Sequence, residues 1–66
     1  MSPDDLARAF ARTFSGPHGE AVLAHLRAIT IERRLGPDAG DALLRFVEGQ
    51  RALVATVEAL IRRGRG

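Results

Sequence analysis

Three residues of the segment SGPHGE have the side-chain types of a catalytic nucleophile, its base and an orienting acid. Ser15 would attack a substrate, His18 would take its proton, and Glu20 would hold the imidazole in place. These residues fall within one short turn, and no donors for an oxyanion and no water-excluding pocket accompany them. We therefore expect a protein that is not an enzyme and has no catalytic residues.

Metal and cofactor chemistry has equally little support. The chain has no cysteine, and its two histidines, His18 and His25, stand seven positions apart. Two imidazoles do not specify a metal site, and no glycine-rich phosphate loop follows a strand. The sequence predicts neither a bound metal nor a cofactor.

Arginine is the residue type that most suggests a ligand. All ten basic residues are arginine, and the terminal segment RRGRG contains Arg62, Arg63 and Arg65. Guanidinium groups bind phosphate in a fork, so these three are candidates for a nonspecific DNA contact. No aromatic residue accompanies them for stacking on bases. The alternative is a solvated tail that only keeps the protein soluble.

Length and composition point to one small globular domain. Sixty-six residues with 45% hydrophobic content form a marginally stable core, which dense helix packing or oligomerisation must support. The acidic start is unlike a signal peptide, and no apolar run approaches the roughly 18 residues of a membrane span. We expect a protein that is cytoplasmic when made and does not enter the membrane.

Turn residues divide the chain into three helices and leave no strand. Ser2 and Pro3 start the first, which breaks after Phe14, and the second runs from about 17 to 35. Gly36 and Pro37 end the second helix, and Asp38 caps a third that runs from about 38 to 62. The predicted fold is all-α, an antiparallel hairpin of helices two and three with the shorter N-terminal helix packed on it. Residues 1–61 form the domain, and 62–66 form a short basic flexible tail.

The second helix has apolar residues on two faces. Val22, Leu23, Leu26 and Ile29 suit a stripe on helix three that includes Phe46, Val47, Val54 and Val57. Ala24, Ala28, Ile31 and Leu35 lie about half a turn away. Phe10 and Phe14 of the first helix could cover this second face, or a second subunit or a larger partner could cover it.

Two residues of helix three break its apolar pattern. Gly49 lowers the stability of the helix in whose interior it lies. Such a glycine is tolerated where another backbone approaches the helix closely. Gln50 lies inside the apolar stripe and needs hydrogen-bond partners there. Those partners would be carbonyls of the turns around Gly16 and Gly36, or a second chain whose register the amide fixes.

The segments FARTFSGPHGEAVLAHL and FVEGQRALVATVEALI resemble a family of short helical proteins of tailed phages, prophages and gene transfer agents. The matching positions are Phe10, Phe14, Pro17, Gly19, Val22, Leu23 and Leu26, followed by Gly49, Gln50, Arg51, Leu53 and Val54. The resemblance covers about residues 10 to 61. Genes of this family tend to lie in the head, portal and packaging region, so the resemblance implies a non-enzymatic role in virion assembly and incorporation in a phage-like particle.

The resulting prediction is a particle protein that acts by binding protein, either another copy of itself or a larger virion or packaging protein. The candidate interface residues are Ala24, Ala28, Ile31, Leu35, Gly49 and Gln50. One alternative is a small-terminase-like packaging subunit whose basic tails contact DNA. Another is a small regulator or inhibitor that binds one host protein.

Overall fold

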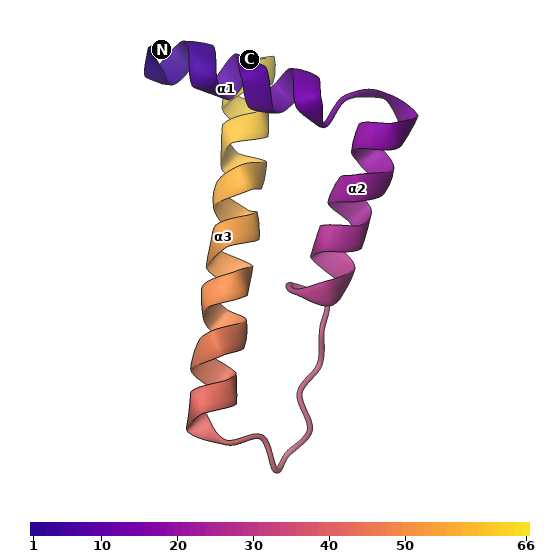
Figure 1. Ribbon diagram of the computed structural model, residues 1–66, viewed down its shortest axis with the longest axis vertical. Helices are drawn as coiled ribbons and strands as arrows, with labels where there is room; N and C mark the ends of the chain where they lie inside the picture. Colours follow the sequence, from indigo (N-terminus) through magenta and orange to yellow (C-terminus); the bar gives the residue numbers. More distant parts are fainter.

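The computed structural model describes residues 1–66 and consists of three helices connected by a corner and a loop (Figure 1). Helix α1 spans Pro3–Thr13, α2 spans Gly16–Ile29, and α3 spans Asp41–Arg65. No strand is present, so the predicted all-α class is confirmed. No helix combines the length and the apolar composition that a membrane crossing requires.

Local sequence alone determines the start of α1. The Ser2 hydroxyl accepts a hydrogen bond from the Asp5 amide at 3.1 Å, and the Asp5 carboxylate accepts one from the Ser2 amide at 3.4 Å. This reciprocal capping box, with Pro3 behind it, satisfies amides that have no partner within the helix. Hydrogen bonds from the Arg8 side chain and from Ser2 hold the pKa of Asp5 below its ordinary value. The predicted start of the first helix is thus confirmed.

A tight corner connects α1 to α2. Gly16 adopts a positive φ of 73°, and Gly19 is buried so closely against the backbone of Phe14 that a Cβ there would lie 2.8 Å from the Thr13 carbonyl oxygen. Ser15 occupies the cap position of α2, but its hydroxyl donates to the Arg12 carbonyl at 2.7 Å instead of capping the new helix. The two glycines therefore allow the chain to turn without a loop.

Helix α2 is shorter than predicted, because it ends at Ile29 and not near residue 35. The Thr30 hydroxyl donates to the Leu26 carbonyl at 2.6 Å, which closes the last turn. From α3, the Arg51 guanidinium donates to the carbonyl oxygens of Thr30 at 3.2 Å and Arg33 at 2.6 Å. Arg51 is 21 residues from Thr30 and 18 from Arg33. Because this side chain supplies hydrogen bonds to both carbonyls, further helical turns are not needed to supply them.

Helix α3 is displaced toward the C-terminus relative to its predicted bounds. Gly40 is the N-cap and Asp41 the first helical residue, so Asp38 does not cap the helix as predicted. At the other end the helix continues to Arg65, through the segment for which fraying was expected. Gly64 lies in this last turn, directly against the Ala7 carbonyl of α1.

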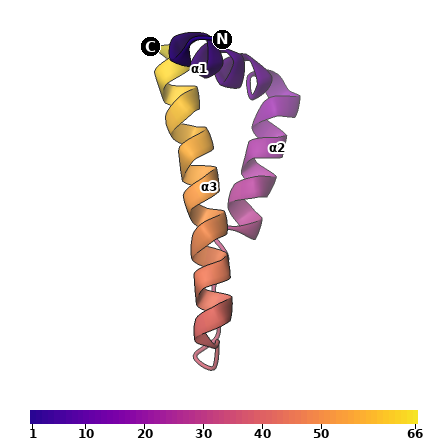
Figure 2. The same cartoon turned by 60° about the vertical axis from the view of Figure 1, so that its left-hand side comes forward.

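The three helices form an open frame with a small core. Helices α2 and α3 run antiparallel, as predicted, and α1 lies across the C-terminal end of α3 (Figures 1 and 2). The closest packing joins α1 to α3, whereas α2 makes fewer contacts with α3, among them the 2.5 Å ion pair between Arg27 and Glu58. Only four apolar side chains are buried, and they are Ala7, Val47, Val54 and Ile61. So few buried side chains leave much apolar surface exposed.

Candidate protein-interaction surface

Two neighbouring faces of α3 differ sharply in what covers them. Val47, Val54 and Ile61 recur every seven residues, which returns them to nearly the same side of the helix, and all three are buried. Arg51 and Glu58 lie beside this row and reach α2 through their hydrogen bonds. The α2 side of α3 is therefore the covered one.

A second row with the same spacing is largely uncovered. Phe46 and Leu53 are 61% and 66% exposed, and the third member of the row, Leu60, is half-buried near the α1 crossing. Exposure of Phe46 corrects its predicted place in the core stripe. Apolar side chains this exposed and aligned on one small protein are typical of a binding surface.

Gly49 lies on the same face as Phe46 and Leu53. A Cβ built on Gly49 would have no heavy atom within 4 Å, so no part of the chain approaches this glycine closely. The predicted tight packing at Gly49 is therefore absent within the chain. A close approach there would have to come from another molecule.

Gln50, next to this face, is half-buried and its Oε1 atom is fully buried without a hydrogen-bond partner. The predicted bonds from its amide to carbonyls of the turns around Gly16 and Gly36 do not form. A buried acceptor without a donor costs stability until something supplies one. Gln50 and Gly49 remain candidates for an intermolecular contact.

The other four predicted interface residues do not share one helical face. Ala24 and Ala28 are exposed on α2, whereas Ile31 and Leu35 lie beyond the end of α2 in the segment that leads to α3, and both are half-buried. Phe10 and Phe14 stack on each other, with ring centroids 6.5 Å apart, and leave Ala24 and Ala28 uncovered. The uncovered surface that the structure adds is the Phe46–Leu53 row, whose two large apolar residues are seven positions apart in the sequence.

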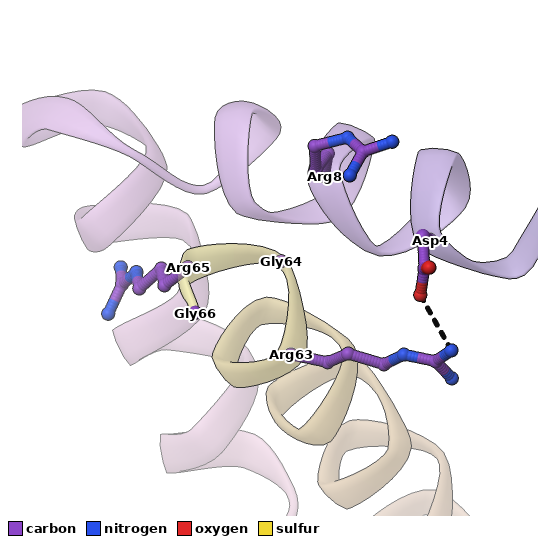
Figure 3. A pocket seen from close by; sticks show the side chains of 6 residues that line it. All are labelled: Asp4, Arg8, Arg63, Gly64, Arg65 and Gly66. Carbon is purple, nitrogen blue, oxygen red and sulfur yellow. Dashed lines mark hydrogen bonds and ion pairs between the residues drawn. The ribbon is translucent and has the colours of Figure 1, made fainter.

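The basic end of the molecule does not gather its arginines around one point. An open hollow of about 310 Å³ lies where α1 crosses the end of α3, and Asp4, Arg8, Arg63, Gly64, Arg65 and Gly66 line it. Arg63 donates to the Asp4 carboxylate at 2.7 Å, Arg8 donates to the Asp5 carboxylate, and the Arg65 side chain points away from the Asp4–Arg63 pair (Figure 3). Arg62 and Arg65 make no ion pair. The hollow therefore lacks the converging donors of a phosphate site.

The three residues considered for catalysis form no hydrogen bonds with one another. Ser15, His18 and Glu20 are all exposed, and the Ser15 hydroxyl donates to the Arg12 carbonyl and not to the imidazole. No group of three or more histidine, cysteine, aspartate or glutamate side chains is placed to hold a metal ion.

Comparison with known protein families identifies a relationship for most of the chain. A family model described as Bbp19-like phage protein matches residues 10–62. Neither the curated proteins nor the solved structures contain a match to this chain. The matched range begins inside α1 and takes in all of α2 and the exposed row of α3.

Proposed function

The chain belongs to the Bbp19-like phage protein family, and from this premise we propose that it is a non-enzymatic component of a phage or gene-transfer-agent particle. Its work is to bind protein in the head, portal or DNA-packaging module. The surface that binds is the exposed face of α3 around Phe46, Gly49 and Leu53.

The observation that supports this proposal is the exposure of Phe46 and Leu53 on one helix. Both side chains belong to the 25-residue α3, with Phe46 in its second turn and Leu53 at its centre. Burying side chains of this size contributes about 1.5–3 kcal/mol each toward binding a partner. Large apolar groups on a preformed helix are a common form of protein-recognition site.

Deleting the gene from a particle-producing strain tests the role. We expect fewer DNA-filled heads by electron microscopy, and complementation with the wild-type gene should restore them. Complementation with Leu53→Glu should fail, whereas Leu44→Glu, on the opposite side of α3, should succeed. A normal yield of filled, infective particles from the deletion strain would refute a role in assembly.

A second candidate function is contact with DNA, which the unpaired Arg62 and Arg65 favour. If these side chains bind phosphates, log affinity for duplex DNA falls with log salt by about 0.9 per neutralised phosphate. Fluorescence anisotropy with the wild type and with the Arg62→Gln/Arg65→Gln double variant measures this slope. Equal slopes for the two proteins would exclude the two arginines as the DNA contact.

A further inference from the structure

The exposed face of α3 alternates large and small residues in two parallel columns. In sequence order the face contains Ala42, Phe46, Gly49, Leu53, Thr56 and Leu60. These positions are separated by four and three residues in turn, the spacing of a coiled-coil seam. One column therefore contains only the small residues Ala42, Gly49 and Thr56. The other column contains only the large residues Phe46, Leu53 and Leu60.

Such a seam is complementary to itself in one orientation. In a parallel pair of helices, equivalent positions meet, so Phe46 would face Phe46 while Gly49 faced Gly49 across a gap. In an antiparallel pair the large column of each helix faces the small column of the other, and side chains interdigitate as knobs into holes. From this we propose that two copies of the chain associate through antiparallel α3 helices, an inference that rests on the proposed protein-binding function and names the partner.

One register uses every position of the seam. It places Leu53 of each copy over Gly49 of the other, Phe46 over Thr56, and Leu60 over Ala42. Gly49 then lies where the two backbones come closest, which accounts for a glycine with no neighbour inside its own chain. The contact from residue 42 to residue 60 is about 27 Å long at 1.5 Å per residue.

Charge along α3 favours the same orientation. Asp41 stands at the start of the helix, and Arg62, Arg63 and Arg65 stand in its last turn. In the antiparallel register, the acidic start of one α3 lies near the level of the basic last turn of the other, and the helix dipoles oppose each other. A parallel pair would instead bring together six arginines, three from each copy.

Helix α1 limits how far the second copy can slide. Its backbone lies against Gly64, one helical turn beyond Leu60, so the α3 seam is open only on the N-terminal side of this crossing. In this register the α3 of the second copy starts at Asp41, level with Ile61, so a shift further along would bring it against α1.

Sedimentation equilibrium of the full chain tests the association. We expect a concentration-dependent dimer for the wild type and for Leu44→Glu, and a dissociation constant at least about tenfold higher for Leu53→Glu. The two variants make the same substitution nine positions apart, on opposite sides of the helix. Circular dichroism should show equal helix content in both. A wild type that stays monomeric up to its solubility limit, or equal association of the two variants, would overturn the proposal.

A spin label reports the orientation. The chain has no native cysteine, so Arg62→Cys gives a single labelling site on an exposed position. The labelled positions of an antiparallel dimer should be separated by about 33 Å along the helix axis, since residue 62 of one copy is level with residue 40 of the other. A label-to-label distance under about 30 Å would leave no room for this axial separation and would refute the assigned seam.

The two proposals can fail separately. A monomeric chain whose Leu53→Glu variant still abolishes filled heads would refute self-association and retain the role in assembly, with another protein on α3. A dimer in solution together with normal particles from the deletion strain would retain the antiparallel pair and refute the role in assembly.

Discussion

Gly64 of α3 lies directly against the backbone carbonyl of Ala7 in α1, with no room for a side chain between the two helices. A Cβ on Gly64 would also come within 2.9 Å of the Ala11 methyl group. The Asp4–Arg63 ion pair lies beside this contact. Both partners of that pair are more than half exposed, so the ion pair contributes little and the backbone contact decides the packing.

Replacing Gly64 with alanine should therefore displace α1. Overpacking of this kind costs about 1–3 kcal/mol, because α1 must shift to admit the methyl group. Hydrogen exchange should show faster exchange of the α1 amides, and chemical denaturation should show a lower free energy of unfolding. Unchanged α1 protection in Gly64→Ala would contradict the contact.

The same substitution at Gly49 should have two effects of opposite sign. Gly49 meets nothing within its own chain, so Gly49→Ala should raise the stability of the monomer by about 1 kcal/mol through helix propensity alone. The added methyl group should separate the paired helices and weaken the dimer. Thermal unfolding at low concentration and sedimentation at high concentration measure the two effects. Stronger association of Gly49→Ala would show that the helices do not approach closely at this glycine.

Arg51 should determine where α2 ends. Removing its hydrogen bonds to the Thr30 and Arg33 carbonyls in Arg51→Ala should cost about 2 kcal/mol, since charged donors make the stronger bonds. Arg51→Lys should restore little of this, because an ammonium group cannot reach two carbonyls in a planar fork. Amide exchange over residues 30–35 measures the loss. Full rescue by lysine would mean that charge alone holds the turn.

Acid should loosen the start of α1. The pKa of Asp5 is lowered from 3.8 by hydrogen bonds from Arg8 and Ser2, so its ionised form favours the folded helix. That contribution is complete above the ordinary pKa and is lost as the pH falls through the lower pKa of the folded state. Carboxyl NMR titration should give a pKa for Asp5 below 3.8 that moves back toward it in Ser2→Ala. An Asp5 pKa at or above its ordinary value would contradict the capping box.

The sequence predicts best what depends on near neighbours. Ser2, Pro3 and Asp5 determine the start of α1 through contacts three residues apart, and three helices follow from the glycines and prolines between them. The end of α2 could not be predicted, because Arg51 satisfies its last carbonyls from another helix. In the sequence, Gly64 in a terminal segment suggests that the end of the helix frays. In the structure this glycine instead allows the Ala7 backbone of α1 to approach α3, which the sequence alone does not indicate.

The exposed face of α3 around Phe46 and Leu53 also depends on contacts that are distant in the sequence. The apolar pattern of α3 is wide enough to predict two adjoining faces, but it does not say which face α2 covers. Arg51 and Glu58 decide this through their contacts with α2, and those contacts leave Phe46 and Leu53 uncovered.

The Ala7–Gly64 contact also sets the order of events during synthesis. Its two residues are 57 positions apart, so α1 leaves the ribosome before the part of α3 on which it packs has been synthesised. Helix α1 has an apolar side with Leu6, Phe10 and Phe14, and it must remain undocked until residue 64 has been translated and released from the exit tunnel. Docking of α1 onto α3 therefore requires closing a loop of 57 residues, and the entropy of closing that loop slows this step of folding.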